Sequence, residues 1–182
     1  MPAALLRQLD AQTVAAVSSV TGRSSTIDRA VAALAEHLAK VHVLLLGALI
    51  VGGRGTLRRR HRETALRIGL VLPLTIAVVG AVGKLIRRTR PFVDQAGLPL
   101  VDHHPGRSFP SRHAACAAAM TTVALRGAPR IGQAMATLGA VLAASRVYAG
   151  LHYPSDVVGG WAIGVGLGML VRQREATVAS VG

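Results

Sequence analysis

The chain has 182 residues and is poor in cysteine, in aromatic side chains and in acidic ones. Because Cys116 is its one cysteine, an intramolecular disulfide and a metal site built from cysteines are both excluded. Aromatic residues make up 3% of the chain, which leaves few side chains on which nucleic-acid bases could stack. Against 8 Asp and Glu there are 21 Lys and Arg, a formal net charge of +13. The basic residues lie in short separate clusters, so a nucleic-acid-binding protein is disfavoured.

Hydrophobic residues make up 51% of the chain, a share that soluble proteins rarely combine with so high a charge. Apolar segments separated by arginine clusters explain both features and predict an integral membrane protein. With no internal repeat or linker, residues 1–182 are predicted to form a single domain. The first 22 residues lack the basic start and apolar core of a cleavable signal. Residues 5–20 have the pattern of a weak amphipathic helix, and residues 1–28 are expected to lie at the membrane interface.

Five apolar segments have the composition of membrane helices. The predicted fold is therefore all-α: a polytopic membrane bundle of about five spanning helices plus the N-terminal amphipathic helix. Several segments are shorter than the roughly 20 residues that an isolated membrane helix needs, so their ends must extend into polar sequence or line a water-filled vestibule. The third segment is rich in alanine, as close helix packing demands. The five are residues 30–51, 65–86, 112–125, 131–147 and 157–171.

Loop charge predicts how these helices are oriented. The strongest basic cluster, residues 53–62, is expected to stay in the cytoplasm. Up-and-down threading then puts the clusters at 126–130 and 172–175 on that same side. A further cluster, residues 84–90, falls on the opposite side, where basic residues are not expected. Binding of a phosphate group would give this cluster a reason to lie there.

The same threading brings the residues that could carry chemistry to one face of the membrane. Lysine and arginine side chains can neutralise a phosphate group, arginine with paired donors. Pro110 and Ser111 precede an alanine-rich segment as a helix start does, where free backbone N–H groups favour an anion. Pro154 interrupts regular helix near His152, which is therefore expected on a loop. The converging residues are Lys84, Arg90, Ser111, His113, Arg146, His152 and Asp156.

Two histidines and one aspartate are predicted to carry the chemistry. Asp156, in the first helical turn after the loop, can accept a hydrogen bond from one ring nitrogen of His152. That contact fixes the tautomer and leaves the other nitrogen free to attack phosphorus. His113 can act as the general acid that protonates the leaving oxygen. Taken alone, the pair of His152 and Asp156 is also compatible with a purely structural, buried hydrogen bond.

Three stretches of the chain resemble the signature of the type 2 phosphatidic acid phosphatase superfamily, which contains lipid phosphatases and vanadium-dependent haloperoxidases. They are Lys84 through Arg90-Pro91, then Pro110-Ser111-Arg112-His113, then Ser145-Arg146 with His152 and Asp156. The resemblance implies a helical bundle, a phosphohistidine intermediate, and no cofactor or metal requirement. It implies that His152 is the nucleophile, Asp156 its orienting residue and His113 the acid. Phosphate binding is implied for Lys84, Arg90, Ser111 and Arg146.

The chain departs from the family pattern at two points. Arg112 stands where the family has glycine, which adds a positive charge and a further candidate for phosphate binding. Lys84 and Arg90 enclose five residues where the family has six, so Arg87 and Arg88 are alternatives for the role of Lys84. Arg87 and Arg88 are also compatible with an interfacial role, in which their side chains reach lipid headgroups.

Within the superfamily, the chain is most similar to the bacterial undecaprenyl-diphosphate phosphatases. The likeness lies in Arg90-Pro91-Phe92-Val93, in the pair His103 and His104, and in residues 108–111. His103 and His104 precede the second motif, where they are either part of a solvated loop or auxiliary groups for pyrophosphate recognition or gating.

The predicted function is hydrolysis of a polyprenyl diphosphate, such as undecaprenyl diphosphate, to the monophosphate carrier of cell-wall synthesis. The site is expected at the extracytoplasmic face of a bacterial plasma membrane, with the lipid substrate and membrane lipids as partners. One alternative is a phosphatase for another lipid phosphate: phosphatidate, phosphatidylglycerophosphate or a decaprenyl-linked sugar phosphate. Another is a non-catalytic membrane protein that binds or transports lipids. A haloperoxidase is disfavoured because those enzymes are typically soluble and much larger.

Overall fold

The computed structural model describes residues 2–94, 100–101 and 106–179, with side chains described for 4–94, 100–101 and 106–171. All regular structure within these ranges is helical, which confirms the predicted all-α class. The helices are α1 (Pro2–Ser18), α2 (Ser25–Val51), α3 (Gly55–Ile86), α4 (Pro91–Asp94), α5 (Arg112–Gly127), α6 (Pro129–Tyr148) and α7 (Pro154–Ala179).

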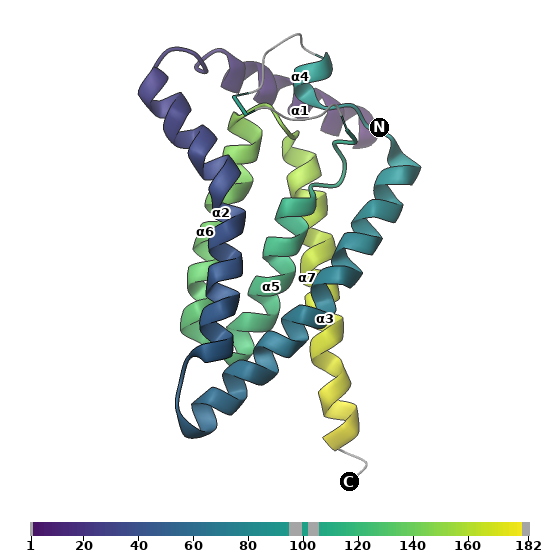
Figure 1. Ribbon diagram of the computed structural model, residues 1–182. Coiled ribbons are helices and arrows are strands. Elements are labelled where there is room, and N and C mark those ends of the chain that lie inside the picture. The colour runs from purple at the N-terminus through teal and green to yellow at the C-terminus, as the bar shows by residue number, and fades with distance from the viewer. Residues whose placement is uncertain (1, 95–99, 102–105, 180–182) are drawn as a thin grey trace.

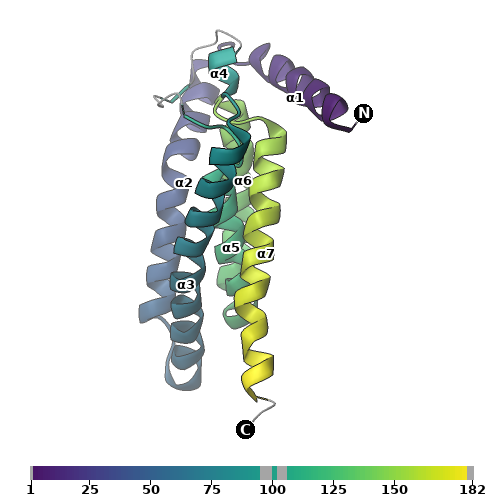
Figure 2. The ribbon, with the colours of Figure 1, turned by 90° about the vertical axis from the view of Figure 1, so that its right-hand side faces the viewer.

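Five helices form an elongated bundle. Figure 1 and Figure 2 show α2, α3, α5, α6 and α7 running along one axis, with α1 lying across one end. The short helix α4 lies at that same end, which we call the α1 end. The opposite end carries the connections between α2 and α3 and between α5 and α6. Within the described chain this arrangement agrees with the predicted bundle plus N-terminal helix.

Three stretches of the described residues are long and apolar enough to cross a membrane: Ser25–Val51, Gly55–Asp94 and Pro154–Val171. The shorter helix α5 packs against α2, α3, α6 and α7, which makes it the centre of the bundle. Its buried face is largely alanine, and such small side chains let several helices approach closely. A membrane bundle is thus confirmed, and length and hydropathy single out three of its helices as spans.

Glycines on α7 fix its contact with α5. Gly160, Gly164 and Gly168 recur every four residues and so lie on one face of the helix. A Cβ at Gly160 would collide with the carbonyl oxygen of Ser111, the N-cap residue of α5, and one at Gly164 with that of Ala115 in α5. A Cβ at Gly168 would lie 2.7 Å from Cβ of Thr122. The two backbones therefore approach as only glycine allows. This contact sets the start of α5 against the start of α7, where the Ser111 N–H donates to the carbonyl of Asp156 at 2.9 Å.

The N-terminal helix α1 is amphipathic, as predicted, and its apolar face points outward. Leu5, Leu6 and Leu9 are exposed, whereas Asp10 and Val14 are buried against the bundle. Exposed leucines on a helix that crosses the end of a membrane bundle are typical of an interfacial segment. One acidic residue of this helix is therefore enclosed at the α1 end.

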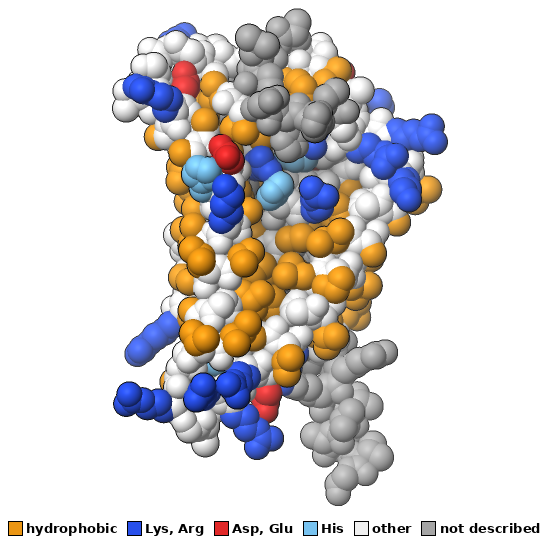
Figure 3. Space-filling view, in the orientation of Figure 1, with side chains coloured by type: hydrophobic (Ala, Val, Ile, Leu, Met, Phe, Trp, Pro, Cys, Tyr) orange, Lys and Arg blue, Asp and Glu red, His pale blue; other side chains and the backbone are white. Residues whose placement is uncertain are grey.

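The opposite end of the bundle is strongly basic, and we call it the basic end. Arg60 and Arg67 of α3 and Arg126 of α5 line one shallow cavity there, so two of the basic clusters in the sequence meet. Figure 3 shows hydrophobic side chains in a broad middle band, with basic side chains toward both ends. The band is the surface that hydrocarbon would cover, with charge at its two margins.

Candidate active site

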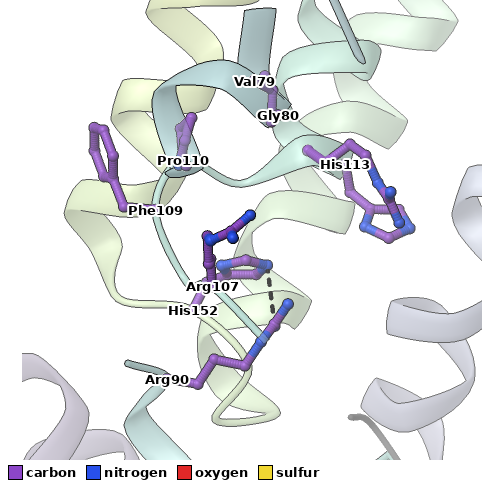
Figure 4. A pocket seen from close by; sticks show the side chains of 10 residues that line it. Val79, Gly80, Arg90, Arg107, Phe109, Pro110, His113 and His152 are labelled. Atoms are coloured by element: carbon purple, nitrogen blue, oxygen red, sulfur yellow. Dashed lines mark hydrogen bonds between the residues drawn. The ribbon is translucent and has the colours of Figure 1, made fainter. Parts of the chain in front are cut away.

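A cavity of about 210 Å³ opens toward the α1 end of the bundle and is lined mostly by residues of the three signature motifs or their neighbours. The third motif contributes His152 from the loop between α6 and α7, as its spacing predicted. Figure 4 shows Arg107 and Arg90 on either side of the His152 ring. The lining residues are Val79, Gly80, Gly83, Arg90, Arg107, Phe109, Pro110, Arg112, His113 and His152.

The partners of the His152 ring define its tautomer. Nδ1 lies 2.9 Å from the carbonyl oxygen of Ser108, and Nε2 lies 3.5 Å from Nη1 of Arg90 (Figure 4). Because a carbonyl oxygen only accepts, Nδ1 carries the proton; because a guanidinium only donates, Nε2 presents its lone pair. The ring is thus arranged with Nε2 as the nitrogen able to attack phosphorus.

The environment of His152 also favours its neutral form. Burial lowers the pKa of the imidazole below its ordinary value, and the charges of Arg90 and Arg146 lower it further. The nearby carboxylate of Asp156 acts in the opposite direction, without cancelling the effect of burial. A neutral imidazole at neutral pH is the state that a histidine nucleophile requires.

Asp156 is fully buried behind the ring, and its contacts differ from the simple pair expected from sequence. Oδ2 lies 3.8 Å from Nδ1 of His152, within ion-pair range but farther than the Ser108 carbonyl. The same oxygen accepts from the Ser108 hydroxyl at 2.5 Å and from the Tyr153 N–H at 2.8 Å. Oδ1 accepts from Nη1 of Arg88 at 2.9 Å. The Asp156 carboxylate therefore stabilises the loop around His152, whereas the Ser108 carbonyl makes the direct hydrogen bond with Nδ1.

Three buried polar atoms near the cavity have no hydrogen-bond partner in the described protein: Nε of Arg90, Oγ of Ser111 and Nε of Arg146. Ser111 is the N-cap residue of α5, yet its hydroxyl makes no capping bond. Buried donors without partners are costly, so they indicate a place where a ligand supplies acceptors. Phosphate oxygens are suitable acceptors for two guanidinium groups and a hydroxyl.

His113 and Arg146 are in direct contact. Nη2 of Arg146 lies 2.9 Å from Nε2 of His113, and the imidazole lies in the first turn of α5. His113 lines the cavity together with His152, so the predicted acid and the predicted nucleophile share one space. This juxtaposition is what an acid on the leaving-group side of a phosphate requires.

Two other predicted site residues of the described chain, Lys84 and Arg87, are not among those that line the cavity. Val79, Gly80 and Gly83 of α3 line the cavity, whereas Lys84, the residue after Gly83, does not line it and is exposed. Arg87 is also exposed and ends α3 with a left-handed backbone, φ 37°. Phosphate binding by Lys84 stays a prediction. His103 and His104 lie outside the described residues.

Sequence reasoning missed several residues that the fold brings to the site. Arg107 lines the cavity, and its position two residues ahead of the Phe109-Pro110 pair was the signal that could have identified it. Ser108 contributes both its carbonyl, to His152, and its hydroxyl, to Asp156. Asp10 of α1 contacts Arg88, and no local pattern in the sequence links residues so far apart.

The fold and the cavity together define a helical membrane protein with a cavity in which arginines lie beside two histidines. The chain belongs to the PAP2 superfamily, whose family model matches residues 64–178. The match includes all three signature stretches. Membership of this family supports a lipid phosphatase.

Individual relatives carry different substrate names. The undecaprenyl-diphosphatase BcrC of Bacillus subtilis is 27% identical over 85% of this chain and 78% of its own length. The decaprenylphosphoryl-5-phosphoribose phosphatase of Mycobacterium tuberculosis is 33% identical over 84% of this chain and 85% of its own. An undecaprenyl-diphosphatase of Sulfolobus acidocaldarius is 34% identical over 64% of this chain, and the match spans only 58% of that relative.

The fold also matches that of a solved structure. The crystal structure of Aquifex aeolicus LpxE superposes with a TM-score of 0.67, covering 93% of both chains. At 22% sequence identity this likeness supports the fold alone.

Proposed function

We propose that the protein is an integral membrane phosphatase that hydrolyses a polyprenyl diphosphate, undecaprenyl diphosphate or a close analogue, to the monophosphate. The observation that carries this proposal is the His152 ring. Its Nδ1 donates to the Ser108 carbonyl, and its Nε2 faces a cavity lined by arginines. Such an arrangement is suited to forming and breaking a bond between nitrogen and phosphorus.

In the first step, the Nε2 lone pair of His152 attacks the terminal phosphorus of the lipid. A P–N bond forms, and the bond from phosphorus to the bridging oxygen breaks. His113 gives its proton to that oxygen, and the lipid monophosphate leaves. The charges of Arg90, Arg107 and Arg146 stabilise the transferring phosphoryl group, while Ser111 donates to one of its oxygens.

In the second step, water attacks the phosphohistidine. His113, now neutral, takes a proton from the water, the P–N bond breaks, and inorganic phosphate is released. The electron pair of that bond returns to Nε2 of His152, which restores the resting ring. Asp156 and the Ser108 carbonyl stabilise the positive charge that the imidazole carries while it is phosphorylated.

The lipid chain has a suitable place beside this site. A second cavity of about 210 Å³ shares Arg112 and His113 with the first, and most of its other lining residues are apolar. They include Val43, Leu72 and Ile76, from α2 and α3. We propose that the first isoprene units lie there, with the phosphate groups in the arginine-lined cavity. An apolar wall joined to a few polar groups is typical of a site for an amphipathic ligand.

Sidedness and metal independence belong to the same proposal. The basic end would lie in the cytoplasm of a bacterial cell, and the active site would open at the extracytoplasmic face of the plasma membrane. No metal ion is needed, because the arginines supply the positive charge that magnesium supplies in other phosphoryl-transfer enzymes. Phosphate release should then persist in EDTA and be inhibited by vanadate.

A second candidate substrate is a decaprenyl-linked sugar phosphate. It is favoured by the Mycobacterium tuberculosis relative, which matches most of both chains at 33% identity. Purified protein would be assayed for phosphate release from undecaprenyl diphosphate, decaprenylphosphoryl-5-phosphoribose, phosphatidate and phosphatidylglycerophosphate. We expect the highest kcat/KM for the diphosphate, and a clear preference for a monophosphate would contradict the first choice.

The nucleophile is tested by His152→Ala, which should reduce turnover by about 10³-fold or more while the protein stays folded. His37→Ala is the matched control, because His37 is exposed on α2 and its contacts are to Glu36 and Lys40. Retained activity in His152→Ala would refute the assignment. The non-catalytic, lipid-binding alternative would instead be favoured if the wild-type protein released phosphate from none of the assayed lipids.

A further inference from the structure

Asp10 is a buried carboxylate on a mostly exposed surface helix. Its exposed fraction is 3%, although the neighbouring Leu9 is half exposed. Oδ2 accepts from Nη2 of Arg88 at 2.7 Å and from the Ser155 hydroxyl at 2.5 Å, and Oδ1 accepts from the Ser155 N–H at 3.0 Å. Helix α1 thus turns its leucines outward and directs a charge at the first turn of α7. A buried charge is retained only where such partners compensate its desolvation.

Arg88 connects Asp10 to the catalytic loop. Its Nη1 donates to Oδ1 of Asp156 at 2.9 Å and to Oγ of Ser155 at 2.7 Å, while Nη2 holds Asp10. The guanidinium carbon lies 3.8 Å from the centre of the Tyr153 ring, which fixes the plane of the group. One arginine therefore bridges two buried carboxylates, one from α1 and one from α7.

We propose that Asp10 is a positioning residue of the active site: acting through Arg88 and Ser155, it holds Asp156 and the loop that carries the nucleophile. The inference rests on the proposed function, since it assumes that His152 attacks phosphorus. Asp10 itself contacts neither cavity nor ring; its effect passes along a chain of alternating charges, Asp10, Arg88, Asp156 and His152.

Removing the charge of Asp10 should destabilise the positively charged form of His152. With Asp10 in place, the charge of Arg88 is shared between two carboxylates. Without it, Arg88 is balanced by Asp156 alone, and Asp156 offers less stabilisation to a positive charge on His152. The imidazole becomes positive when it is phosphorylated, so chemistry slows while substrate binding is little changed. Among the described residues, the other charged or titratable groups around His152 are Arg90, Arg107, Arg112, His113, Arg146 and Tyr153.

The test is Asp10→Asn in the full chain, assayed on the lipid that the wild type hydrolyses best. We expect kcat to fall about tenfold or more, as for loss of one charge-assisted hydrogen bond, with KM within about twofold. Asp10→Glu keeps the charge and should recover part of the loss. Asp28→Asn is the matched control, because Asp28 also lies at the α1 end but accepts from Tyr148 and the Gly22 N–H.

A second readout does not depend on turnover. Nitrogen-15 histidine NMR of the wild type and of Asp10→Asn would follow the titration of the His152 ring, assigned with His152→Gln. We expect the midpoint to move to lower pH in Asp10→Asn and to stay in place in Asp28→Asn. If the midpoint is unchanged and kcat matches that of Asp28→Asn, Asp10 is structural only and the inference fails. If the wild type hydrolyses no lipid in the panel, the proposed function fails while this titration still decides the role of Asp10.

Discussion

His152 combines a fixed tautomer with a lowered pKa, and both follow from its neighbours. The Ser108 carbonyl holds the proton on Nδ1, and burial together with Arg90 and Arg146 disfavours the imidazolium. Since only neutral His152 can attack, kcat/KM should rise with pH as the free enzyme loses this proton. Because its pKa is lowered, the acidic limb should lie below the ordinary histidine value of about 6.5. A pH profile of phosphate release measures this, and a limb above that value would contradict it.

Substitution of Ser111 should lower activity without lowering the stability of the protein. Its hydroxyl is buried without a partner, so Ser111→Ala removes an unsatisfied group and should leave the free energy of unfolding unchanged or raise it by up to about 1 kcal/mol. Because the substitution also removes a hydrogen-bond donor to the bound phosphate, kcat/KM should fall about tenfold. Thr75→Val is the control, because the Thr75 hydroxyl bonds the Val71 carbonyl within α3. Equal activity in Ser111→Ala and wild type would exclude Ser111 as a phosphate ligand.

At the scale of residues, the sequence indicates the site where its partners are close in the chain. Arg146 at the end of α6, His152 on the following loop and Asp156 in the first turn of α7 are close in the chain, so their spacing alone predicted that they lie together. The contacts that complete the site join distant segments: Ser108 to His152, and Asp10 to Ser155. These depend on how α1 and α7 pack, which local spacing does not encode. Lys84 lies in the first signature stretch, yet it is exposed and does not line the cavity, so membership of a motif does not by itself place a side chain in the site.

At the scale of helices, the glycine face of α7 holds α5 in register with the site. Gly164→Val adds a side chain where even a Cβ would collide with the Ala115 carbonyl, so α5 has to move. We expect the free energy of unfolding to fall by about 1–3 kcal/mol, with a loss of kcat/KM because α5 carries Ser111 and His113. Thermal unfolding and phosphate release measure the two effects.

Gly166→Val is the matched control for this substitution, because a Cβ at Gly166 meets nothing within 4 Å. It places the same β-branched residue two positions along the same helix, so it has the same helix propensity cost. If both variants lose stability equally, propensity explains the result and the close contact of α5 with α7 contributes nothing measurable.

The apolar runs predicted that the helices exist, and they also predicted the ends at Val51 and Ile86 and the start at Arg112, but not the starts of α2 and α3. The segment expected at 30–51 begins at Ser25, because Ser24 provides an N-cap whose hydroxyl accepts from the Ile27 N–H. The segment expected at 65–86 begins at Gly55, since the arginine cluster continues the helix beyond the apolar run. Polar helical turns at a membrane margin have no hydropathy signal, so boundaries shift outward from the apolar core.

At the scale of the whole molecule, the basic residues that predict orientation lie at one end of the bundle and the candidate site lies at the other. Arg60 and Arg126 meet at the basic end, while the α1 end holds the arginines of the cavity among buried carboxylates and histidines. The cluster at the basic end can determine orientation. The arginines at the α1 end are instead paired with Asp10 and Asp156 or line the candidate site. Counting basic residues without this distinction would give conflicting orientations.

Orientation can be measured directly with single cysteines. In a Cys116→Ala background, Thr56→Cys marks the basic end and Val93→Cys marks the α1 end, both at exposed positions. If the site faces outward, a membrane-impermeant maleimide should label Val93→Cys on intact bacterial cells and Thr56→Cys only after permeabilisation. The physical reason is that arginine-rich loops resist translocation, which retains the basic end in the cytoplasm. The reverse labelling pattern would put the active site in the cytoplasm and require a lipid phosphate presented by the inner leaflet.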